Sequence, residues 1–143
     1  MNIQVATTLY TGEETTRVIG WAGALIEEPY HAVLEQVRYV PSRVYISCTL
    51  YGSPAAVSLK PGVWIVEIAG RKVTDLGSFL EAIHNHEKEV AENEDDDGYV
   101  RIKTVSRMEV TKVVAMKLDP HYWGTWQLVK DENATTGWKC IPA

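Results

Sequence analysis

The sequence predicts a small α+β domain in which short strands outnumber helices. Short apolar or alternating segments recur along the chain, glycine and proline separate them, and one segment has the spacing of an amphipathic helix. With 143 residues, of which 45% are hydrophobic and 23% charged, the chain can build one folded core but is short for two domains. We therefore expect a single domain with flanking tails.

The first predicted elements form a strand, a tight turn and a second strand over residues 17–28. Gly20-Trp21-Ala22-Gly23 divides two β-branched or apolar stretches, and glycine permits the positive φ angles that tight turns need. Pro29 is expected to end the second strand because it cannot donate to a ladder. Residues 30–41 follow as an irregular or partly helical connection, and residues 1–16 precede the domain as an N-terminal extension.

The middle of the chain predicts two further strands and a short helix. Residues 43–50 alternate between apolar and polar positions, which is typical of a half-buried strand. Ser53 is placed to cap a short helix that begins at Pro54. Residues 63–69 are almost continuously apolar and predict a buried strand, followed by a turn and a short strand at residues 72–73.

The clearest helix follows, with Thr74 or Asp75 as its cap. Its apolar residues fall at i, i+3, i+4 and i+7, namely Leu76, Phe79, Leu80 and Ile83. An acidic stretch then leads through Gly98 into a predicted hairpin of residues 99–105 and 110–118. The domain is expected to end there. The tail, residues 119–143, carries several large aromatic side chains and is expected to dock on the domain.

Composition argues against several classes of function. The formal charge of −5 and the absence of a lysine and arginine cluster argue against nucleic acid as a partner. No apolar run reaches the ~18 residues that span a bilayer, so we expect no membrane partner and a soluble intracellular chain. Cys48 and Cys140 are expected to be free thiols, and no spacing of ligands indicates a metal or another cofactor.

Catalytic residues are not expected in this chain. Ser53 is the one serine in a glycine turn that could suggest a nucleophile, but the second glycine of a nucleophile elbow is missing. His84 and His86 lie two residues apart, so on a helix they point in different directions and do not form a metal site. We expect a recognition module and not an enzyme.

The glycine turn suggests a binding site. The strand after the turn and the later amphipathic helix could lie side by side, with the backbone N–H groups of the turn at one end of the groove between them. Such a groove can bind an extended peptide and its terminal carboxylate.

The same segments resemble a PDZ domain of the kind attached to HtrA-family serine proteases. Gly20-Trp21-Ala22-Gly23-Ala24 is similar to the carboxylate-binding loop of that family, and residues 52–56 with 59–62 resemble its most recognisable stretch. Residues 21–26 and His121-Tyr122-Trp123 look most like the duplicated HtrA-type proteases of fungi and plants. The resemblance implies a PDZ-like barrel or sandwich of five to six strands with two helices, and a nuclear location if the chain is fungal.

The resemblance also implies a site and its partners. Protein or peptide C-termini would add a strand beside Ala24–Ile26, with Arg17 as a supporting positive charge and helix residues lining the groove. The expected site comprises Arg17, Gly20, Trp21, Ala22, Gly23, Ala24, Leu25, Ile26, Leu76, Leu80 and Ile83. Phe79 and Ala82 are expected in the core.

Two departures from the family support a second hypothesis, a structural module that packs against neighbouring domains of a parent protease without ligand binding. Ala22 and Ala24 stand where bulky apolar residues are usual, and Val63-Trp64 replaces the usual acidic residue after Gly62. Residues 29–41 are also longer than a compact PDZ domain needs, so this segment could cover the groove.

Overall fold

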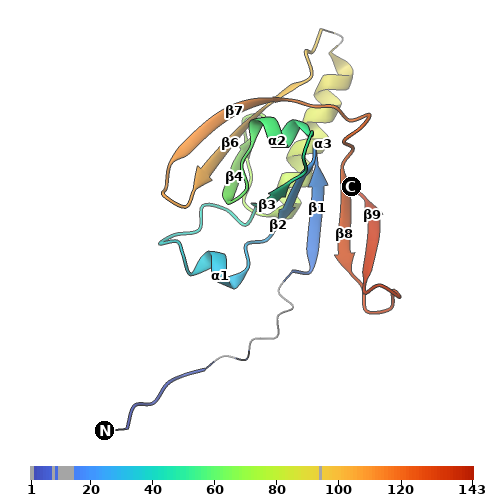
Figure 1. Ribbon diagram of the computed structural model, residues 1–143. Coiled ribbons are helices and arrows are strands. Elements are labelled where there is room, and N and C mark those ends of the chain that lie inside the picture. Colours follow the sequence, from blue (N-terminus) through green and yellow to red (C-terminus); the bar gives the residue numbers. More distant parts are fainter. Residues whose placement is uncertain (1, 8, 10–14, 94) are drawn as a thin grey trace.

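The computed structural model describes residues 2–7, 9, 15–93 and 95–143, and it shows one antiparallel sheet with three helices (Figure 1). The sheet order is β7-β6-β4-β3-β2-β1-β8-β9, with the short β5 paired to β4. The α+β class is confirmed. The strands are β1 (Arg17–Trp21), β2 (Ala24–Glu27), β3 (Tyr45–Thr49), β4 (Val63–Ile68), β5 (Arg71–Lys72), β6 (Tyr99–Ser106), β7 (Thr111–Lys117), β8 (Trp126–Lys130) and β9 (Trp138–Pro142).

The helices begin where their capping residues predict. In α2 (Pro54–Ser58) the Ser53 side chain accepts a hydrogen bond from the Ala56 N–H, and proline occupies the first turn. In α3 (Leu76–Glu92) the Asp75 carboxylate accepts the Ser78 N–H, and the Ser78 side chain completes a capping box. The third helix, α1 (His31–Leu34), is a single turn without a side-chain cap.

The main core lies between the sheet and α3. The helix buries the four predicted apolar residues together with Ala82, so Phe79 and Ala82 lie in the core as expected. The rings of Trp21 and Phe79 pack in a T-shaped arrangement, nearly perpendicular to each other, with centroids 5.5 Å apart. This packing joins β1 to the helix at the middle of the domain.

The long connection after Pro29 packs away from α3. Val33 of α1 forms a second apolar cluster with Tyr45 and Trp64, whose rings lie 5.1 Å apart. The expectation that residues 29–41 could cover the groove beside β2 is therefore wrong. Trp64 belongs to the Val63-Trp64 pair that the resemblance set against a usual acidic residue, and it is 1% exposed within this second cluster.

The C-terminal residues extend the same sheet. Strand β8 pairs antiparallel with β1, from Arg17 opposite Val129 to Gly20 opposite Trp126, and β9 pairs with β8 (Figure 1). The sheet has more strands than the five or six expected because β5, β8 and β9 add to it. Sequence periodicity missed β8 and β9, since their strong signal was aromatic content and not alternation.

We predict that truncation after Leu118 destabilises the domain. The truncated chain loses β8, so the outer edge of β1 and the surface under Trp126 become exposed to water. The melting temperature should fall by at least about 5 °C and the chain should associate at high concentration. Removal of residues 1–9 serves as the control and should leave both properties unchanged. An equally stable, monomeric truncated chain would contradict the role given to β8.

Candidate functional site

The predicted binding strand, β2, has a partner on each side. It pairs antiparallel with β1, from Val18 opposite Glu27 to Trp21 opposite Ala24. On its other side it pairs antiparallel with β3, from Ala24 opposite Thr49 to Glu27 opposite Tyr45. A peptide adds to a sheet through the free backbone groups of an edge strand. In this structure β2 lies inside the sheet, so the place expected for a ligand is taken by β1.

The geometry of the β1–β2 hairpin shows which backbone groups of β2 face β1. Ala22 and Gly23 have φ angles of 49° and 83°, as in a two-residue type I′ turn. The residues flanking such a turn, Trp21 and Ala24, form a hydrogen-bonded pair, and the next such pair is Ile19 with Ile26. The N–H and C=O groups of Ala24 and Ile26, which were expected to bind a ligand, therefore face β1.

The turn itself is covered by other parts of the chain. The Ala22 carbonyl accepts the N–H of Ala55, and the Gly23 carbonyl accepts the N–H of Leu50. A side chain at Gly23 would overlap Ser53 and touch Trp123. Trp21 and Ala22 are almost fully buried. The loop expected to hold a carboxylate is thus a packed junction between β1, α2 and the C-terminal residues.

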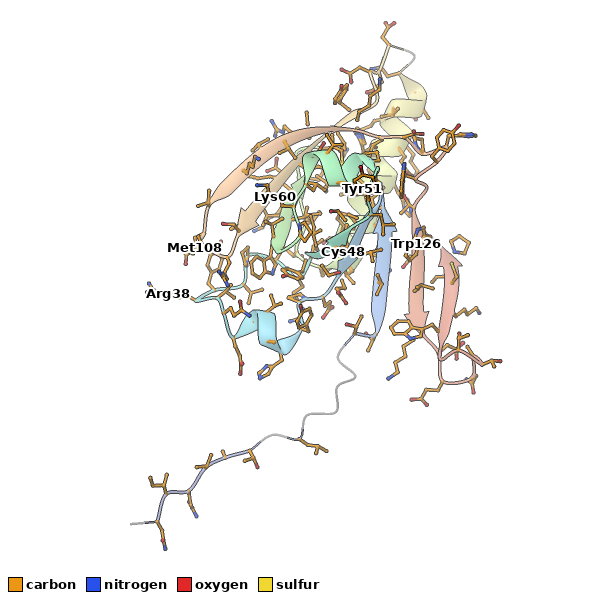
Figure 2. The ribbon with its side chains drawn as sticks, in the orientation of Figure 1. Arg38, Cys48, Tyr51, Lys60, Met108 and Trp126 are labelled. Carbon is orange, nitrogen blue, oxygen red and sulfur yellow. The ribbon has the colours of Figure 1, made fainter. Side chains whose placement is uncertain are left out.

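Trp126 closes the adjacent surface of β1. A Cβ atom at Gly20 would overlap the Trp126 indole, so the ring lies directly on the glycine backbone. Figure 2 shows Trp126 at the start of β8, beside β1. A small cleft of about 210 Å³ remains between the hairpin and the segment 122–126, and Trp123 and Trp126 line it.

Arg17 lies at the far end of β1 from the turn. Trp21 lies four residue steps further along the strand, a distance of roughly 13 Å. Its guanidinium donates to the Gln127 side-chain oxygen, with a distance of 2.9 Å from Nε, and Gln127 Nε2 donates to the Pro142 carbonyl. Arg17 thus links β1 to β8, and through Gln127 to β9, at the end of β1 away from the turn. The supporting role expected for it beside a ligand carboxylate stays a prediction.

The three expected helix residues do come together, but inside the core. Leu76, Leu80 and Ile83 are 3%, 8% and 1% exposed and share one cluster with Ile19 and Trp21. The structure therefore brings the helix and the hairpin into contact, as expected, and fills the space between them with side chains. Leu25, on the other face of β2, is partly exposed.

The residues that sequence reasoning missed are the tail aromatics over the hairpin. A glycine inside a strand often marks a close approach of another segment. Gly20 carries that signal, since it lies within β1 and not in the turn as expected. The glycine at position 20 and the aromatic tail, considered together, could have predicted that a tail tryptophan such as Trp126 packs on β1.

The pKa shifts of two titratable groups have local structural causes. Burial, followed by nearby Tyr30 and Glu27, raises the pKa of Tyr45, which belongs to the second apolar cluster. The hydrogen bond from the Ser78 backbone lowers the pKa of Asp75.

Within residues 2–7, 9, 15–93 and 95–143, no group of three or more His, Cys, Asp or Glu side chains is placed to hold a metal. In the same residues no helix has the length and apolar character needed to cross a membrane.

These features form a mostly β, α+β domain that is compatible with a PDZ-like fold, and side chains fill the space between its N-terminal hairpin and α3. No protein-family model matches the chain. Sequence relatives do match: over 94–99% of its length the chain is homologous to a segment of HtrA-family serine proteases, consistent with a PDZ domain of such a protease.

Three relatives show the extent of the match. The pro-apoptotic serine protease NMA111 of Chaetomium globosum is 33% identical over 142 residues, 99% of this chain. Protease Do-like 7 of Arabidopsis thaliana is 35% identical over 143 residues, 97% of this chain, and NMA111 of Phaeosphaeria nodorum is 35% identical over 137 residues, 94% of this chain. The chain spans 12–13% of the length of these relatives.

We predict strong coupling between Gly20 and Trp126. Gly20→Ala should cost about 1–3 kcal/mol because the new methyl group overlaps the indole. In a Trp126→Ala background the cost of the same change should fall by at least about 1 kcal/mol. Urea unfolding of the four proteins measures both values.

Gly124→Ala is the matched control. A Cβ atom there would lie 3.6 Å from the Pro120 carbonyl oxygen, an ordinary contact, so its cost should stay within about 0.5 kcal/mol. Equal costs for the two alanine substitutions, or additive effects of Gly20→Ala and Trp126→Ala, would contradict the packing of Trp126 on β1.

Proposed function

We propose that this domain is a non-catalytic PDZ-like packing module of an HtrA-type protease, in which β1 permanently occupies the groove beside β2. The observation that carries the proposal is the pairing of β2 on both edges. In this view residues 17–118 keep the PDZ-like plan, and residues 119–143 dock on it as a tail. The domain then serves its parent chain through contacts with other domains or proteins, not by capturing C-termini.

Peptide binding by strand addition at Ala24–Ile26 is the rival function, and its energetic cost is large. A ligand strand needs β1 to leave, which exposes Ile19 and Trp21, 0% and 2% exposed in the folded domain. Exposing two such side chains costs roughly 5 kcal/mol in total. Each 1.4 kcal/mol is a factor of ten, so an intrinsic micromolar affinity would weaken to about millimolar.

The carboxylate end of that site has a second obstacle. A ligand carboxylate needs backbone N–H groups that point into open space. The turn is instead packed under Ser53 and Trp123, and the nearest expected cation, Arg17, is engaged with Gln127. Opening the turn would therefore disturb α2 and β8 as well as β1.

We predict that the domain does not bind C-terminal peptides with an affinity better than about 1 mM. A library of random peptides with free C-termini, labelled at the N-terminus, is titrated with the domain by fluorescence anisotropy. The same peptides with amidated C-termini are the control for carboxylate dependence. Saturable micromolar binding that amidation abolishes, with NMR shifts at Ala24, Ile26 and Leu80, would overturn the proposal and restore the peptide-binding function.

A further inference from the structure

Strand β7 is the end strand of the sheet, and no other strand of the described residues pairs with its outer edge. The Ser106 N–H donates to the Val110 carbonyl and the Leu118 N–H to the Gly98 carbonyl, so the even-numbered residues of this hairpin face β6. The backbone groups of Thr111, Val113, Ala115 and Lys117 consequently point away from β6. Among the described residues these groups have no strand partner.

A groove opens beside the second half of this edge. It has a volume of about 760 Å³ and lies between α2 and β7, with Val57 and Ser58 on the helix side and Ala115 and Lys117 on the strand side. Trp123 forms part of its wall. A strand edge beside a helix is the arrangement that recognises extended peptides. The structure closes that arrangement at β2 and α3 but leaves one open at β7 and α2.

Exposed apolar side chains follow the same edge. Val57 is 87% exposed on α2, and Val113 on β7 is 53% exposed. Met108 and Val110, at the turn that joins β6 to β7, are also exposed, and Figure 2 shows Met108 at that end of the hairpin. Because α2 packs against β7 beside the groove, an added strand would cover mainly Val113 and the turn residues Met108 and Val110, which gives it apolar contact as well as backbone hydrogen bonds.

The charge of the hairpin is opposite to that of the whole chain. Residues 99–117 contain five lysines and arginines and one acidic residue, Glu109, whereas the chain carries a formal charge of −5. Glu67 of β4 pairs with Arg101 at 3.0 Å and lies 3.9 Å from Lys103. Lys112 and Lys117 lie on β7 itself and are exposed. Asp119, at one end of the groove, is the acidic residue of its lining.

We propose that the outer edge of β7 receives an extended acidic segment of a partner polypeptide as an additional antiparallel strand. Lys112 and Lys117 attract the acidic side chains of that segment. The same two lysines disfavour a second copy of this chain, because β7 edges of two copies would bring like charges together. This inference is independent of the closed groove at β2, so the two can fail separately.

Lys112 and Lys117 project from opposite faces of β7, near its two ends. The probe is therefore a heptapeptide with two glutamates at each end and three valines between them, which places carboxylates on both faces of the added strand, and it is acetylated and amidated so that it has no terminal charge. A matched peptide has lysine in place of glutamate. NMR titration of the domain should give saturable shifts at Thr111, Val113 and Ala115 with the glutamate peptide, and at least tenfold weaker binding of the lysine peptide. The capped ends prevent any contribution from carboxylate capture at the turn beside β2.

Two substitutions at one position test the backbone contact. Val113→Pro removes an outward N–H that no β6 group uses and should weaken binding of the glutamate peptide at least tenfold. Val113→Thr keeps that N–H and should change the affinity by less than twofold. If Val113→Pro does not fold, the charge-reversed K112E/K117E variant tests the proposed site instead. This variant should bind the lysine peptide more tightly than the glutamate peptide.

Several results would overturn the inference. These are equal binding of the two peptides, shifts that map outside β7 and α2, unchanged affinity in a folded Val113→Pro protein, and an unchanged peptide preference in the charge-reversed variant. Sedimentation of the domain alone tests the second copy as occupant. A dimer that Val113→Pro dissociates would also overturn the inference, because the edge would then be occupied by another copy.

Discussion

The antiparallel pairing of β1 with β2 through the Ala22-Gly23 turn determines how the rest of the molecule is arranged. The two positive φ angles of the turn let the chain reverse, so that β2 returns directly alongside β1. Ile19 and Trp21 then enter the core against α3, and the outer edge of β1 becomes available to β8. The closed groove, the docked C-terminal strands and the position of Arg17 all follow from this one hairpin.

The hairpin also explains why a PDZ-like plan here need not imply PDZ-like binding. Homology to a segment of HtrA-family proteases fits the order of the elements. The availability of backbone groups, however, depends on which strands pair, and β2 pairs with a strand on each side. A fold can therefore be shared while the site on it is filled. The nuclear location implied by the resemblance stays a prediction.

Local signals in the sequence predicted most of the fold. The caps at Ser53 and Asp75, the helix spacing from Leu76 and the hairpin of residues 99–118 each depend on residues close in sequence. The site was harder to predict because it depends on contacts between distant segments. Nothing near Gly20 reveals that Trp126 lies on it, and nothing near Arg17 reveals Gln127 more than a hundred residues away.

Hydrogen exchange at the amides of Ala24 and Ile26 tests the central claim most directly. These N–H groups face β1, so they exchange only when β1 separates from β2. If β1 is a permanent part of the core, both amides should exchange with a free energy close to that of global unfolding, measured by NMR across a series of low denaturant concentrations. Exchange of both amides through a local opening several kcal/mol below global unfolding would contradict the account, because the groove would then open while the domain stays folded.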